Sequence, residues 1–143
     1  MGVGNTSGFV KRQTPLRIFI VDDDRDTREL IEAIFSKDGF ECRSADGGAD
    51  AMRVLGSYVP DVIISDLSMP DEDGYALMAR IRSLSNAFAT VPAIALTALT
   101  GAHHRQAVFE SGFDAFLVKP AHPTTLIEVV TRLALASRAE VAS

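Results

Sequence analysis

Five short apolar runs, each followed by a segment with helical spacing, constrain the fold of this chain more than any other feature. The runs span residues 16–21, 40–44, 62–66, 91–96 and 115–118. Most lack a strict alternation of polar and apolar residues and are rich in β-branched or aromatic residues, which is typical of strands buried on both faces of a sheet. The segments between them place apolar residues three and four positions apart, as amphipathic helices do. This alternation predicts parallel strands joined by right-handed helical crossovers.

The predicted fold class is therefore α/β, a three-layer α/β/α doubly wound fold around a five-stranded parallel sheet. Helices are expected over residues 27–37, 48–57 and 102–111, after Gly74 as far as Leu84, and from Pro123 onward. Residues 15–137 are expected to form a single domain. A disordered lead of residues 1–14 would precede it and a tail of residues 138–143 would follow.

Composition excludes several classes of function. The net charge of −5 provides no basic face for general nucleic-acid binding. No apolar run approaches the roughly 20 residues that a membrane-spanning helix needs, so no membrane insertion is expected. Cys42 is the one cysteine, which rules out an internal disulfide and favours a reducing, cytoplasmic location.

Polar side chains end or follow four of the five runs. Asp22 and Asp23 follow the first run, Asp66 ends the third, and Thr97 and Lys119 follow the last two. Because the carboxyl ends of parallel strands lie along one edge of a sheet, these side chains are expected to converge in one crevice. Carboxylate oxygens suit a divalent cation such as Mg²⁺ or Mn²⁺, and lysine and threonine can contact a phosphoryl group. A carboxylate can also act as a nucleophile toward phosphorus.

The motifs at these positions resemble the receiver domain of two-component response regulators. They are Val21-Asp22-Asp23, then Ser65-Asp66-Leu67-Ser68-Met69-Pro70 followed by Asp73-Gly74, then Leu96-Thr97-Ala98, and finally Val118-Lys119-Pro120. The resemblance extends from Leu16 to about Leu135. It implies a flavodoxin-like sheet with the strand order 2-1-3-4-5, as in chemotaxis receivers.

The resemblance also implies a metal site and a phosphoacceptor. Asp66 would accept the phosphoryl group. Asp22 and Asp23 would hold Mg²⁺, with Asp23 the more direct ligand, and Asp66 and the backbone carbonyl of Ser68 would complete the protein ligands. Acids directly after a strand can also serve as helix caps, and Asp24 or Asp26 is expected to cap the helix that follows.

Other positions would contact or report the phosphoryl group. By resemblance, Lys119 would pair with the phosphoacceptor, and the Lys119–Pro120 peptide bond would be cis. Thr97 and Phe116 would be the switch residues, the hydroxyl moving toward the phosphoryl group and the ring turning inward. Leu99 occupies a position that tunes dephosphorylation in the family, and its side chain cannot orient a water molecule by hydrogen bonding.

The resemblance implies partners as well. The phosphate donor would be a histidine kinase or a histidine phosphotransfer protein, and the output would be a downstream protein target. A homodimer through the fourth helix, fifth strand and fifth helix is one form that the family suggests. The chain would be a single-domain regulator or a receiver excised from a hybrid histidine kinase. The alternative from another class is a Mg²⁺-dependent phosphohydrolase that uses Asp66 as its nucleophile.

Overall fold

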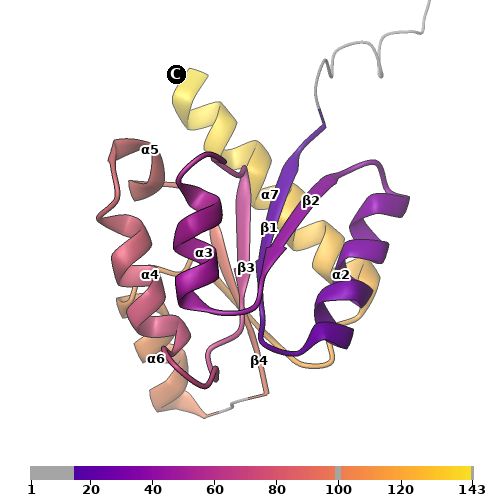
Figure 1. The fold of residues 1–143 in the computed structure, drawn as a ribbon. Helices are drawn as coiled ribbons and strands as arrows, with labels where there is room; N and C mark the ends of the chain where they lie inside the picture. Colours follow the sequence, from indigo (N-terminus) through magenta and orange to yellow (C-terminus); the bar gives the residue numbers. More distant parts are fainter. Residues whose placement is uncertain (1–14, 99–100, 143) are drawn as a thin grey trace, which may run out of the picture.

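A five-stranded parallel sheet forms the centre of the computed structural model, which describes residues 15–98 and 101–142 (Figure 1). The strands are β1 (Arg17–Val21), β2 (Glu41–Ala45), β3 (Val62–Ser65), β4 (Ala93–Thr97) and β5 (Ala115–Val118). Their order in the sheet is β2-β1-β3-β4-β5, and every neighbouring pair is parallel. The predicted fold class and strand order are therefore confirmed.

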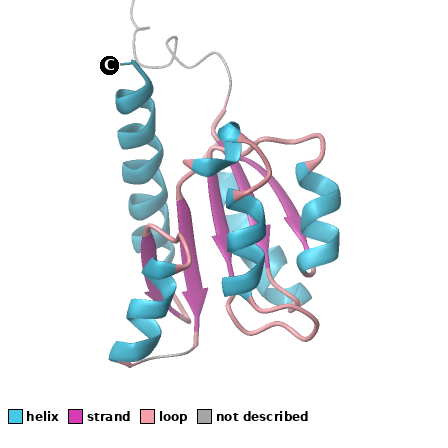
Figure 2. Cartoon of the chain, turned by 90° about the vertical axis from the view of Figure 1, so that its left-hand side faces the viewer, coloured by secondary structure: helices cyan, strands magenta, loops and turns pink. Residues whose placement is uncertain are grey.

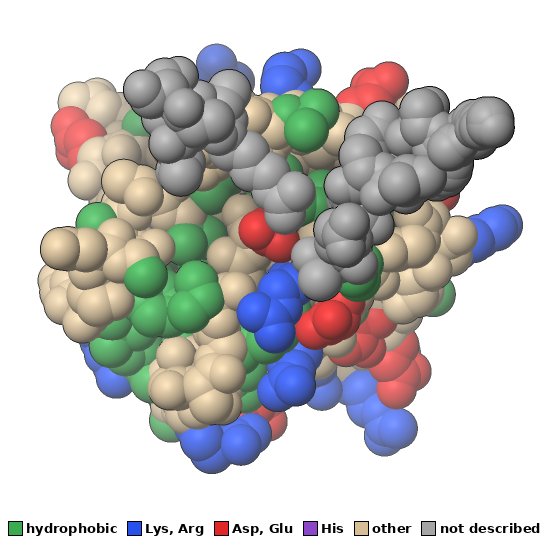
Figure 3. All heavy atoms as spheres, turned by 90° about the horizontal axis from the view of Figure 1, so that it is seen from above, with side chains coloured by type: hydrophobic (Ala, Val, Ile, Leu, Met, Phe, Trp, Pro, Cys, Tyr) green, Lys and Arg blue, Asp and Glu red, His purple; other side chains and the backbone are tan. Residues whose placement is uncertain are grey.

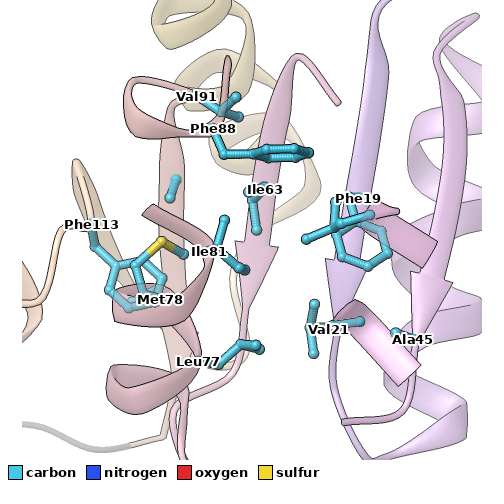
Figure 4. Close-up of a cluster of buried hydrophobic side chains, with 14 of the residues drawn as sticks. Phe19, Val21, Ala45, Ile63, Leu77, Met78, Ile81, Phe88, Val91 and Phe113 are labelled. Carbon is cyan, nitrogen blue, oxygen red and sulfur yellow. The ribbon is translucent and has the colours of Figure 1, made fainter. Parts of the chain in front are cut away.

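Helices cover both faces of the sheet, which gives the three predicted layers (Figures 1 and 2). One face carries α3 (Gly48–Leu55), α4 (Gly74–Arg82), α5 (Asn86–Ala89) and α6 (Ala102–Glu110), and the other carries α2 (Arg25–Lys37) and α7 (Pro123–Ala142). Successive strand residues point to opposite faces, so each face has its own hydrophobic cluster. Phe19 and Ile63 pack in the cluster with α4 (Figure 4), while Ile18 and Ile64 pack in the cluster with α2 and α7.

The strands differ in burial according to their place in the sheet. The central strands β1, β3 and β4 are almost entirely buried. The edge strand β2 exposes Glu41 and Arg43 in alternation with less exposed residues, and the other edge strand, β5, is half-exposed. Burial therefore follows the place of each strand in the sheet, since β5 is half-exposed although its sequence is apolar throughout.

One predicted helix is wrong in its extent. The helix after Gly74 ends at Arg82 instead of reaching Leu84, and the separate short helix α5 follows it. The Arg82 guanidinium donates hydrogen bonds to the carbonyls of Phe88 and Gly112, at 3.0 and 2.7 Å. These hydrogen bonds connect the end of α4 to α5 and to the turn after α6. The spacing of apolar residues does not predict such hydrogen bonds.

The last helix is longer than the sequence predicted. Helix α7 continues to Ala142, into the residues 138–143 that were expected to form a tail, in a stretch with alanine, arginine and glutamate that favours helix. The expected disorder of residues 1–14 concerns residues outside the described part of the chain.

Two helices that follow the site-bearing strands begin at capping aspartates. Asp24 caps α2 by accepting a hydrogen bond from the Thr27 N–H at 3.1 Å, which selects the first of the two expected caps. Asp73 caps α4 in the same way, through the Ala76 N–H at 2.8 Å. Each cap satisfies a backbone donor that the helix leaves unpaired.

Candidate functional site

The carboxyl ends of four strands bring the predicted site residues together. Asp22 follows β1, Asp66 follows β3, Thr97 ends β4 and Lys119 follows β5. The Asp66 N–H donates to the carbonyl at the end of β1 at 2.9 Å, which places the two acids side by side. This end of the sheet lies at the bottom of Figure 1, where the strand arrows point.

Lys119 joins the two buried acids. Its Nζ lies 2.8 Å from Asp22 Oδ2 and 3.2 Å from Asp66 Oδ2. The Lys119 N–H donates to the main-chain carbonyl of Thr97 at 2.8 Å, which attaches this residue to the end of β4. The Lys119–Pro120 peptide bond is cis, as the resemblance implies.

Burial sets the electrostatics of these groups. Asp22 and Asp66 are 2% and 7% exposed, whereas Asp23 is exposed. Burial raises the pKa of Asp22, and the hydrogen bond from Lys119 offsets only part of that effect. Burial by itself would lower the pKa of Lys119, but its hydrogen bonds to Asp22 and Asp66, with their charges, raise it. A charged ammonium therefore faces two carboxylates that it neutralises only in part.

Three carboxylates at this edge can hold a metal ion. Asp22, Asp23 and Asp66 each offer an oxygen, and these oxygens lie within 4.8 Å of one another, the one such group among the described residues. The Asp23 side chain has no hydrogen-bond or ion-pair partner in the described part of the chain, which leaves its oxygens available. Hard oxygen ligands of this kind suit Mg²⁺, which commonly takes few protein ligands and keeps several waters. The residues therefore fit a divalent cation.

Backbone groups orient the Asp66 carboxylate. Its Oδ1 accepts hydrogen bonds from the N–H groups of Leu67 and Ser68, at 2.7 and 3.3 Å, while Oδ2 points to Lys119. The loop is held against α4 by the Gly74 N–H, which donates to the Leu67 carbonyl at 2.9 Å. A Cβ at Gly74 would lie 2.3 Å from the Asp66 carbonyl oxygen, so this approach requires glycine.

The remaining predicted residues surround this centre. Thr97 is buried at the end of β4, and Ser68 is exposed in the loop after Asp66. Phe116 is half-buried, lies opposite Ala95 of β4 and packs against the hydrophobic cluster of the α4 face. Leu99, with its expected effect on dephosphorylation, lies outside the described residues.

One residue that contacts the site was not predicted from the sequence. The Nη1 of Arg28, on α2, donates a hydrogen bond to the main-chain carbonyl of Asp22 at 2.7 Å. The sequence contains only a weak signal for this contact. A helix dipole favours acids near the N-terminus, so an arginine there suggests a specific partner.

Comparison with known proteins identifies the class to which this fold and site belong. The family model described as the response regulator receiver domain matches residues 18–131. The chain belongs to that family, which consists of signalling domains of two-component systems.

Individual relatives agree with this assignment. The chain is 40% identical over 119 residues to an uncharacterized 14.6 kDa protein in the sodA1 3′ region of Leptolyngbya boryana, covering 83% of this chain and 90% of that protein. It is 35% identical over 127 residues to the sensor histidine kinase RcsC of Escherichia coli K12. That match covers 89% of this chain but 13% of the kinase, so the similarity concerns a small part of the kinase.

A solved structure has the same fold. The chemotaxis response regulator CheY4 of Vibrio cholerae superposes with a TM-score of 0.78 at 28% identity, over 84% of this chain and 99% of that one. In the described part of our chain, none of the helices has both the length and the apolar character required to cross a membrane.

Proposed function

We propose that this receiver domain, residues 15–137, accepts a phosphoryl group on Asp66 from a phosphohistidine of a partner protein. The observation that carries the proposal is the Asp66 carboxylate, which is held 3.2 Å from the Lys119 ammonium within a group of three clustered acids. Asp22, Asp23 and Asp66, with the main-chain carbonyl of Ser68, would hold Mg²⁺ or Mn²⁺. The chain then acts as a phosphoacceptor and not as a turnover enzyme.

The chemistry of the transfer uses the groups at this edge. An Asp66 carboxylate oxygen attacks phosphorus, the P–N bond of the donor breaks, and the bonding electrons return to the donor imidazole, leaving an acyl phosphate. The Lys119 ammonium, which contacts Asp66 before the transfer, then donates a hydrogen bond to a phosphoryl oxygen. The Thr97 hydroxyl donates to another phosphoryl oxygen. A cation held by the three acids would neutralise phosphoryl charge, which together with positioning is the main requirement of such transfers.

Phosphorylation would change the surface formed by α6, β5 and α7. Thr97 and Phe116 are the switch residues, the first drawn to the phosphoryl group and the second repacking toward the space beside it. Large apolar side chains are exposed on each element of this surface, namely Phe109, Val118 and Leu135 at 46%, 43% and 58% exposure. Shifting the domain from about 1% to about 99% in the switched conformation needs roughly 5.5 kcal/mol of differential stabilisation. New contacts to the negatively charged phosphoryl group can supply it.

The proposed partners follow from the same surface and from the relatives. A histidine kinase or histidine phosphotransfer protein would donate the phosphoryl group in the cytoplasm. A downstream protein, or a second copy of this chain, would bind the surface of α6, β5 and α7. The match to one part of RcsC supports a receiver from a hybrid kinase, and the match to nearly all of the Leptolyngbya protein supports a single-domain regulator.

Intact-mass measurement after incubation with phosphoramidate tests the phosphoacceptor. Wild-type protein with Mg²⁺ should gain the mass of one phosphoryl group, and it should gain little without the cation. Asp66→Asn should gain none. Asp71→Asn is the matched control, since Asp71 is an exposed acid in the same loop, and it should be phosphorylated normally. An adduct that persists in Asp66→Asn would overturn the assignment.

The same proteins distinguish the receiver from the phosphohydrolase alternative. A receiver takes up one phosphoryl group and shows no sustained release of inorganic phosphate from a phosphomonoester. Steady release by wild-type protein that disappears in Asp66→Asn would favour the phosphohydrolase.

A further inference from the structure

Arg28 makes a contact unlike those of its neighbours on α2. Its Nη1 donates to the main-chain carbonyl oxygen of Asp22 at 2.7 Å, and the contact is partly buried. Arg28 forms no ion pair with any described residue. Arg25, three positions earlier, instead pairs with Glu29 at 2.9 Å on the helix surface. The guanidinium of Arg28 is therefore committed to the backbone of the acidic loop.

The Asp22 carbonyl belongs to the planar peptide unit that also contains the Asp23 N–H. Holding this carbonyl restricts the rotation of that plane, and with it the direction in which the Asp23 side chain leaves the backbone. Asp22 is also held through its own N–H, which donates to the Ala45 carbonyl at 3.1 Å. Arg28 thus fixes the other side of Asp22, where the chain turns toward Asp23.

The three clustered carboxylates depend on the backbone to different degrees. Asp22 accepts hydrogen bonds from the Asp24 N–H and from Lys119, at 2.9 and 2.8 Å. Asp66 accepts from two loop N–H groups and from Lys119. Asp23 has no side-chain partner among the described residues, so its position rests on the backbone that Arg28 holds.

We propose that Arg28 is a positioning residue, which orients the Asp22–Asp23 peptide so that the Asp23 carboxylate joins those of Asp22 and Asp66 around a divalent cation. The inference rests on the proposed metal-dependent function. A purely electrostatic role of Arg28 predicts the opposite change in metal affinity when the residue is replaced. A guanidinium beside a cation site repels the cation, so removing its charge would strengthen metal binding, whereas removing a positioning contact weakens it.

The test measures Mn²⁺ binding by electron paramagnetic resonance of the free ion. Arg28→Met removes the donor and the charge and keeps a long side chain. Arg25→Met is the matched control, with the same change of charge on the same helix, since Arg25 pairs with Glu29 and forms no hydrogen bond to the loop among the described residues. Arg28→Met should bind Mn²⁺ about tenfold more weakly, the effect expected for losing a residue that orients a ligand, while Arg25→Met should bind like wild type.

Circular dichroism establishes that each variant is folded before binding is measured. If Arg28→Met does not fold, Arg28→Gln replaces it, since its amide is too short to reach the Asp22 carbonyl, and it should show the same weakening. A folded Arg28 variant that binds Mn²⁺ as tightly as wild type, or more tightly, overturns the positioning role and leaves the phosphoacceptor proposal intact. Wild-type protein that binds no Mn²⁺ overturns both.

Discussion

Aspartates lie at both ends of the sheet but serve different purposes. At the end where the strands begin, Asp61 precedes β3 and accepts from the Arg17 N–H at 2.8 Å, at the start of β1. Asp114 precedes β5 and accepts from the Ala93 N–H at 2.9 Å, at the start of β4. In both places the acid satisfies the first donor of a neighbouring strand. Figure 3 looks toward this end, where acidic and basic side chains are interspersed.

At the opposite end, acids are buried beside one another. The buried polar residues of the described chain all lie there: Asp22, Ser65, Asp66 and Thr97. Two of these carboxylates share the single ammonium of Lys119, and burial raises the pKa of Asp22 despite that contact. The acids where the strands begin stabilise the sheet. Those at the carboxyl ends leave buried negative charge that is only partly neutralised, at a place where a cation and a phosphoryl group can bind.

The largest stability effect is expected from Lys119→Met, which leaves two buried carboxylates without their cation. The free energy of unfolding should fall by about 3 kcal/mol without added metal, as when one partner of a buried ion pair is removed. Urea denaturation monitored by circular dichroism measures it. Combining the change with Asp22→Asn should restore part of the loss. Equal stability of the single and double variants would show that the carboxylates do not depend on Lys119.

A smaller effect is expected at the other end of the sheet. Asp114→Ala leaves the buried Ala93 N–H unpaired and removes the ion pair with Arg82, 3.3 Å away. The free energy of unfolding should fall by about 2 kcal/mol, the cost of an unsatisfied buried donor. Mn²⁺ binding should not change, and the exposed Asp71→Ala serves as the control for stability. Weakened metal binding in Asp114→Ala would contradict the assignment of separate roles to the two ends of the sheet.

The smallest effect is a pH dependence caused by Asp22. Its folded-state pKa lies above the unfolded value of 3.8, so the folded state binds the proton more tightly. The Asp22 contribution to metal-free stability should therefore increase as the pH falls from neutral through the raised pKa. Asp22→Asn should remove this contribution. Urea unfolding at several pH values compares the two proteins, and parallel pH profiles would contradict the prediction.

Much of the fold could be predicted because burial is encoded in local patterns. Short runs dominated by apolar residues marked the strands, and α2 ends at Lys37, as its apolar spacing predicted. The break between α4 and α5 was not predicted from the apolar spacing, and beside it Arg82 donates to the carbonyls of Phe88 and Gly112. Such contacts join segments that no local pattern relates.

The same division applies to the site. The sequence by itself determined which polar residues gather, since parallel strands end together and Asp22, Asp66 and Lys119 each follow a strand. Only the tertiary structure decided that Asp22 is buried while Asp23 is exposed, and that Lys119 contacts acids 97 and 53 positions away. It also decided that Arg28 holds the Asp22 carbonyl. Burial and hydrogen-bond direction depend on how distant segments pack, and the order of residues along the chain does not specify that.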